Sequence, residues 1–189
     1  MPALPISQKF VLLAAIACCA AWPTQAAQTV DDQTREYEIK AAFIYHLSQF
    51  ADWPSRSGER VFTICVLGAD PFGGKLKALE SRSHLNQAMV TAYPQSATLA
   101  RDCQIVYLAE DQRGNVPAIL NQLRGYPVLT VSSLPGFVDQ GGGVGFVIEN
   151  TRVRLEVNNQ AARRAQIKLS AKLLEVAKRV VDTPVEAAP

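Results

Sequence analysis

The chain has 189 residues, of which 48% are hydrophobic and 19% are charged, and its formal net charge is +2. This length fits one domain with short appendages, and the apolar fraction is too high for a disordered chain. The near-neutral charge lacks the basic excess of nucleic-acid-binding proteins, so we expect no nucleic-acid partner. Two histidines and four cysteines leave little material for a metal site.

Residues 1–26 have the order of a secretory signal peptide. Lys9 precedes an apolar run, Phe10–Ala21, and we place the cleavage site after Ala26, with cleavage after Ala27 as the alternative. The run is too short to cross a bilayer comfortably, which disfavours the alternative of a permanent membrane anchor. Another alternative, a lipid attached at Cys18, has a still shorter apolar run before it. We therefore predict an exported, periplasmic protein from which residues 1–26 are removed.

Cys65 and Cys103 are the cysteines that remain after residues 1–26 are removed. An exported chain folds in an oxidising compartment, so a disulfide between them is favoured over two separate buried thiols, which remain the alternative. A redox site of the thioredoxin type is disfavoured, because the chain contains no Cys-x-x-Cys motif.

The first half of the exported chain alternates between helix and strand patterns. Gln33–Asp52 carries an apolar stripe at helical spacing and is followed by Trp53-Pro54, so we predict an amphipathic helix there. Val61–Leu67 is a nearly continuous apolar run, typical of a strand covered on both faces. The next predicted elements are a helix over Phe72–Leu79 capped by Asp70, a weak strand over Ala88–Tyr93, a helical turn over Gln95–Arg101 and a strand over Cys103–Leu108.

The second half ends in a different pattern. Val144–Ile148 and Arg152–Val157 are separated by three residues, and the second run alternates apolar and charged side chains. This pattern predicts an antiparallel hairpin with one face in water. The other predicted elements are a helix over Val116–Arg124, a strand over Pro127–Ser132, a short helix over Gln160–Ala165 and a final helix that Ser170 caps and that carries Leu173, Leu174, Ala177, Val180 and Val181.

Strands that alternate with helices and then end in a hairpin predict an α/β fold. We expect a three-layer-like sandwich with a mainly parallel sheet and a C-terminal antiparallel hairpin. One domain covers residues 33–182, and residues 183–189 form a flexible tail.

Charged and glycine-rich segments near the hairpin are candidate binding sites. Glu156 lies on the same strand face as Arg152 and Arg154. This face is either an ordinary solvated face or a patch that receives a ligand or a partner's charged group. Gly143 lies in the Gly141–Gly145 turn, which is either a flexible loop or a place where a ligand approaches the backbone. From the residues alone, the ordinary interpretation is favoured in both cases.

Trp53 is a further candidate, because a tryptophan at a helix exit either packs in the core or anchors a partner. His46 and His84 have no His, Cys or carboxylate nearby at metal-ligand spacing, so we expect no metal. A catalytic triad needs only proximity in space, but no Gly-x-Ser-x-Gly motif is present. We therefore expect a protein that is not an enzyme and that needs no cofactor.

Several segments resemble the YfiR family. Ala41–Pro54, followed by Ile64–Gly68 and Asp70–Phe72, is similar to the opening of YfiR-like proteins. The matching segments that follow in order are Cys103–Leu108, Pro127–Ser132, the glycine-rich turn, Leu155–Asn158 and Ser170–Ala177.

The resemblance implies a periplasmic, non-catalytic regulator that forms homodimers. Its best-known type binds the periplasmic sensor region of an inner-membrane diguanylate cyclase and holds it inactive, which lowers cyclic di-GMP and biofilm formation. An outer-membrane lipoprotein sequesters such a regulator. Cys65 and Cys103 match the family's more widespread disulfide pair, whereas a second disulfide of some members has no counterpart after Cys103.

The resemblance also strengthens Glu156 and Trp53 as contacts to a partner or ligand. A different function remains open, namely a periplasmic receptor for a small molecule. In that case the Gly141–Gly145 turn and Glu156 would hold the ligand.

Overall fold

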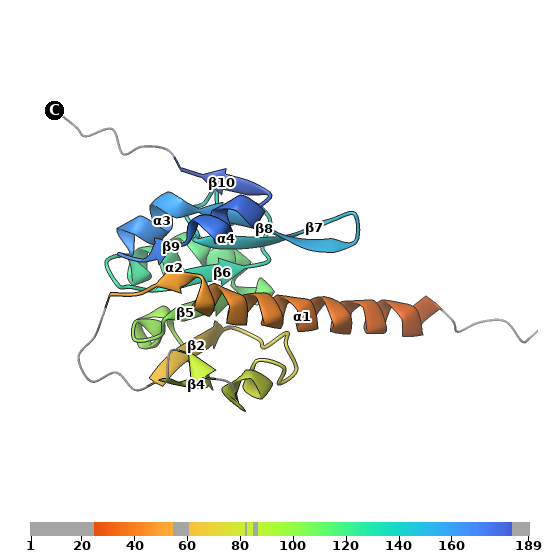
Figure 1. Ribbon diagram of the computed structural model, residues 1–189. Helices are drawn as coiled ribbons and strands as arrows, with labels where there is room; N and C mark the ends of the chain where they lie inside the picture. Colours follow the sequence, from red (N-terminus) through yellow and green to blue (C-terminus); the bar gives the residue numbers. More distant parts are fainter. Residues whose placement is uncertain (1–24, 55–60, 82, 85–86, 183–189) are drawn as a thin grey trace, which may run out of the picture.

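The computed structural model describes residues 25–54, 61–81, 83–84 and 87–182. Most of the predicted signal peptide and the predicted tail, 183–189, lie outside these residues. The first element is helix α1, Gln25–Gln49, which runs along the sheet and extends beyond the body of the domain at its N-terminal end (Figure 1). Within the described residues, no helix is long and apolar enough to cross a membrane.

The central sheet has eight strands in the order β10-β8-β7-β6-β5-β2-β4-β3. Neighbouring strands are parallel except in the β7–β8 hairpin and in the β3–β4 pair. The predicted mainly parallel sheet with a C-terminal hairpin is therefore confirmed. The strands are β2 Val61–Leu67, β3 Ser83–His84, β4 Gln87–Ala92, β5 Ile105–Leu108, β6 Leu129–Ser132, β7 Val144–Glu149, β8 Arg152–Asn158 and β10 Arg179–Val181.

Two apolar cores cover the two faces of this sheet. On one face, Ile44 and Leu47 of α1 are fully buried against strand residues such as Val131. On the other face, the 3-10 helix η2, Ala97–Ala100, and helix α2, Val116–Leu123, cover the sheet. The strands between them have the continuous apolar sequences that burial on both faces requires. Both layers of helix together with the sheet form the predicted sandwich.

A second, small sheet and the C-terminal elements complete the domain. Strand β1, Ala51–Asp52, pairs antiparallel with β9, Lys168–Leu169, so the segment after α1 is joined to the C-terminal part of the chain. The remaining elements are the 3-10 helices η1, Lys77–Ser81, and η3, Glu110–Asn115, and the helices α3, Asn159–Arg164, and α4, Ala171–Val176.

Three element predictions need correction. Gly73 and Gly74 adopt positive φ angles, of 56° and 82°, so the predicted helix over Phe72–Leu79 is a series of turns followed by η1. The predicted final helix ends at Val176, and Arg179–Val181 forms strand β10 beside β8. The first helix spans Gln25–Gln49 instead of Gln33–Asp52, and it ends earlier than predicted because Ala51–Asp52 is engaged in the small sheet.

Candidate functional site

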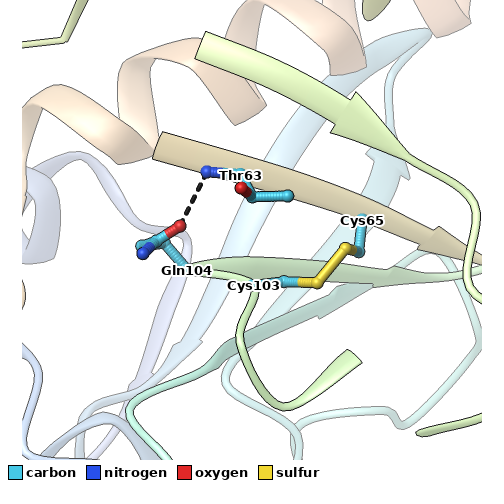
Figure 2. Close-up of a disulfide and its surroundings, with 4 residues drawn as sticks. All are labelled: Thr63, Cys65, Cys103 and Gln104. Carbon is cyan, nitrogen blue, oxygen red and sulfur yellow. Dashed lines mark hydrogen bonds between the residues drawn. A yellow bond between two sulfur atoms is a disulfide. The ribbon is translucent and has the colours of Figure 1, made fainter. Parts of the chain in front are cut away.

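Cys65 and Cys103 form a disulfide, with their Cα atoms 6.0 Å apart (Figure 2). Both side chains are buried, Cys65 within β2 and Cys103 just before β5. The predicted pairing is therefore confirmed, and the alternative of two separate thiols is wrong. The bridge joins adjacent parallel strands on the α2 side of the sheet.

Gln104, which follows the disulfide, connects three strands and was not anticipated as a structural residue. Its side-chain carbonyl accepts a hydrogen bond of 2.6 Å from the Thr63 backbone N–H (Figure 2). Its backbone carbonyl accepts from the N–H of Leu129 and from the indole Nε1 of Trp53. A buried polar side chain needs such partners, so Gln104 fixes the ends of β2, β5 and β6 at which these strands begin.

Trp53 is held by this end of the sheet. Besides the 3.0 Å hydrogen bond to Gln104, its ring contacts Phe62 edge to face at a centroid distance of 5.0 Å. The side chain is half-buried, and these contacts give it a packing role. A partner contact through its exposed part stays a prediction.

Gly143 lies just before β7, between β6 on one side and the end of β8 on the other. Its N–H donates to Thr130 Oγ1 at 2.9 Å, and its carbonyl accepts from the N–H of Asn158 at 2.7 Å. A Cβ atom at this position would lie 2.9 Å from the Thr130 carbonyl oxygen, and one at Gly142 would overlap the Phe137 ring. Protein atoms therefore occupy the space beside these two glycines.

Gly143→Ala is expected to lower the free energy of unfolding by about 1 to 2 kcal/mol, because backbone atoms must shift to admit the methyl group. Urea denaturation measures the change. Gly114→Ala is the matched control, since a Cβ there would meet no atom within 4 Å. Equal stability of Gly143→Ala and the unmutated chain would contradict the close approach.

Glu156 lies in a charge cluster that we call the Arg179 cluster, made of Asp139, Glu156 and Arg179. The Arg179 guanidinium donates to both oxygens of Asp139, at 2.7 and 2.9 Å, and to both oxygens of Glu156, at 3.2 and 2.8 Å. Arg152 and Arg154 lie on the same strand face, as alternation predicted, and both are exposed. The partner of the Glu156 side chain is thus a residue of β10.

The charged residues just before and just after β10 also form ion pairs with other parts of the chain. Lys178 contacts Glu149 at 2.8 Å, and Asp182 contacts Arg163 at 2.9 Å. Hydrogen bonds from Arg179 and Lys178 lower the pKa values of the Asp139 and Glu149 carboxyls, respectively. Backbone pairing with β8 holds this strand at the sheet edge, and these exposed charged contacts add a small contribution.

We expect acid to weaken the attachment of β10. Asp139 and Glu149 have lower pKa values in the folded chain than in the unfolded chain, so their contribution is present above about pH 4 and is lost as the pH falls further. Asp139→Asn should therefore flatten the decrease in urea midpoint between pH 6 and pH 3. Glu175→Gln, at an exposed position on α4, is the control and should leave the slope unchanged. A slope for Asp139→Asn equal to that of the unmutated chain would contradict the linkage.

An apolar groove lies between α1 and α4 and was missed by the sequence analysis. It has a volume of about 230 Å³, and Leu155 of β8 lies in its floor. Val176 at its rim is 58% exposed, and Lys172 places its ammonium 5.7 Å from the Phe50 ring centroid. The apolar groove is lined by Phe43, His46, Leu47, Phe50, Leu155, Lys172, Leu173 and Val176.

The end of the glycine-rich turn lies beside Glu156, since Gly145 pairs with it across the hairpin, whereas Trp53 packs elsewhere, against Phe62 and Gln104. Glu156, Arg152 and Arg154 share one face of β8, whereas Leu155 between them faces the apolar groove. Gly143 and Trp53 are engaged in separate backbone and packing contacts. Among the described residues, no group of three or more His, Cys, Asp or Glu side chains could hold a metal ion.

Comparison with known proteins shows both a family and a fold. A family model described as YfiR/HmsC-like matches residues 37–178. No curated protein matches the chain.

Two solved structures share the fold at low sequence identity. One is a conserved domain protein from Vibrio cholerae, with a TM-score of 0.53 and 10% identity, which covers 76% of this chain. The other is an ABC domain from Streptococcus pneumoniae in complex with L-Trp, with a TM-score of 0.52 and 11% identity, which covers 79% of this chain. The chain spans 60% of the length of each.

Proposed function

Since the chain belongs to the YfiR/HmsC-like family, we propose that it binds the periplasmic sensor region of an inner-membrane diguanylate cyclase and holds that enzyme inactive. Family membership makes it a periplasmic regulatory protein of diguanylate cyclase signalling. The observation that carries the finer proposal is the extent of the match, which runs from the second half of α1 to the end of α4. Cyclic di-GMP and biofilm formation would fall while the regulator is bound.

Such a regulator needs no catalytic group. A protein that binds the inactive sensor conformation more tightly than the active one shifts the equilibrium between them by the ratio of its two affinities. A hundredfold ratio shifts the populations by about the same factor. An exposed surface that recognises one conformation is sufficient for this task.

We propose the apolar groove as the surface that contacts the sensor region. Val176, which lines the groove, is exposed, and the groove's other apolar residues come from α1 and the adjoining Phe50, from β8 and from α4. Lys172 adds a positive charge at the rim. An apolar centre with a charged edge is the usual composition of a protein interface.

Co-purification of the chain with a detergent-extracted diguanylate cyclase tests this surface. Val176→Asp should abolish co-purification, because a carboxylate would be placed in the proposed contact. Leu99→Asp is the matched control, since Leu99 is 67% exposed on η2, which covers the opposite face of the sheet. Loss in both variants or in neither would contradict the groove as the contact, and no co-purification of the unmutated chain would contradict the function.

The family resemblance also leads us to propose a homodimer and an outer-membrane lipoprotein as a second partner. Glu156, Arg152, Arg154, Gly143 and Trp53 remain proposed contacts for a partner or ligand. Arg152 and Arg154 are the exposed members of this set, so substitutions at these two positions should be tested first for loss of partner or ligand binding. Sedimentation equilibrium of the purified chain tests the dimer, and a monomer at all concentrations would contradict it.

A further inference from the structure

The order in which strands are added to the large sheet reverses at β2. Strand β4 pairs with one side of β2, and β5 pairs with the other. After β2 the chain passes through Leu76, which is buried in the core on the α1 side, whereas after β5 it enters α2 on the opposite face. In doubly wound sheets, such a reversal leaves a crevice outside the carboxyl ends of the strands, and ligands bind there.

A cavity of about 480 Å³ is located at this place, and we call it the amide pocket. Its walls are the carboxyl end of β2, the turn between β4 and η2, and the segment from η3 into α2. Buried Leu67 and Ile119 contribute apolar surface. The pocket is named for its side-chain amides, which belong to Gln95, Gln112, Asn115 and Gln122.

Asp111 supplies a fixed carboxylate in the amide pocket. Its two oxygens accept hydrogen bonds from the Ala69 backbone N–H at 3.2 and 3.3 Å, and one also accepts from the Gln112 side chain at 3.2 Å. Gly68 permits this approach, because it has a φ of 101° and a Cβ there would lie 2.2 Å from Asp111 Oδ1. Since the residue is exposed, its oxygens can also accept a hydrogen bond from a ligand.

The composition of the lining selects the charge of a ligand. None of the described residues that line the pocket is Lys, Arg or His, so an anion would meet Asp111 without a counter-charge. An ammonium group would instead form a charge-assisted hydrogen bond with this carboxylate. The amides both donate and accept hydrogen bonds, which suits hydroxyl groups that also do both.

We propose that the amide pocket binds a small hydroxylated amine of about the size of an amino sugar. Its ammonium group contacts Asp111, its hydroxyls contact the amides of Gln112, Asn115 and Gln122, and its apolar face lies on Ile119. This site goes beyond the regulatory role. It also gives a small-molecule ligand a location different from the Gly141–Gly145 turn and Glu156.

Glucosamine is the probe for the test, with glucose and glucuronate as its uncharged and anionic counterparts. In NMR titrations of the exported chain, millimolar glucosamine should produce saturable shifts of the amide resonances of Gln112, Asn115 and Gln122. Glucose should bind more weakly, and glucuronate should not bind. Asp111→Asn should weaken glucosamine binding about tenfold, as expected for the loss of one charge-assisted hydrogen bond.

Two variants on α2 separate occupancy of the pocket from general effects on the helix. Ala118→Phe places a ring in the amide pocket and should abolish the shifts. Asn121→Phe places the same ring at an exposed position of α2 outside the lining and should leave them unchanged. No saturable shift with glucosamine, glucuronate binding as tight as that of glucosamine, or shifts that persist in Ala118→Phe would overturn the proposal.

Discussion

Cys65→Ser is expected to lower the free energy of unfolding by about 3 to 4 kcal/mol. The disulfide closes a loop with a sequence separation of 38 residues, and this restricts the unfolded chain more than the folded one. Chemical denaturation under non-reducing conditions measures the loss, and thiol labelling should find Cys103 reactive once the variant is unfolded. The unmutated protein should label at neither cysteine.

The double variant Cys65→Ser with Cys103→Ser is the control for a free thiol. It should be about as unstable as Cys65→Ser alone, because the cross-link is already absent in the single variant. A Cys65→Ser protein as stable as the unmutated chain would contradict the expected contribution of the bridge.

Trp53→Ala is expected to lower the free energy of unfolding by about 2 to 3 kcal/mol. The substitution removes the ring contact with Phe62 and the hydrogen bond to Gln104, and it leaves a space at the end of the sheet. Trp53→Phe keeps an aromatic ring but loses the donor and part of the indole surface, so it should cost an intermediate amount, about 1 to 2 kcal/mol. Urea denaturation measures both. If Trp53→Ala leaves stability unchanged, the packing role is wrong and a partner contact becomes the better explanation.

The central strands were predictable because their sequences have one compatible structure. Val61–Leu67 and Cys103–Leu108 are short, apolar and rich in β-branched residues, which is what burial on both faces demands. The alternation in Arg152–Val157 likewise predicted both the hairpin and the shared face of Glu156 and Arg154. In each of these cases, the local pattern and the tertiary contacts favour the same structure.

The C-terminal strand was not predictable, because its local pattern favours a helix. Leu173, Ala177 and Val180 are spaced as on one face of a helix, yet Arg179 pairs with Glu156 across two parallel strands. The Arg179 cluster joins residues separated by 23 and 40 positions in the sequence. Such pairing depends on the folded sheet, and a single sequence contains no signal for it.

The helix predicted over Phe72–Leu79 was wrong for a reason that is visible in the sequence. The positive φ angles of Gly73 and Gly74 interrupt a segment whose apolar spacing is helical, so two adjacent glycines should have lowered the expectation of a helix. The sequence also contains no local pattern that would predict the amide pocket or the apolar groove. Each is formed by three segments that only the order of strands in the sheet brings together.

The concentration of cyclic di-GMP in cells tests the central claim most directly. It should be measured in the parent strain, in a strain that lacks this chain, and in that strain after the chain is restored. We predict that the deletion raises cyclic di-GMP and that restoration returns it to the parental level, because the regulator holds a diguanylate cyclase inactive. An unchanged or lower concentration in the deletion strain would contradict this account.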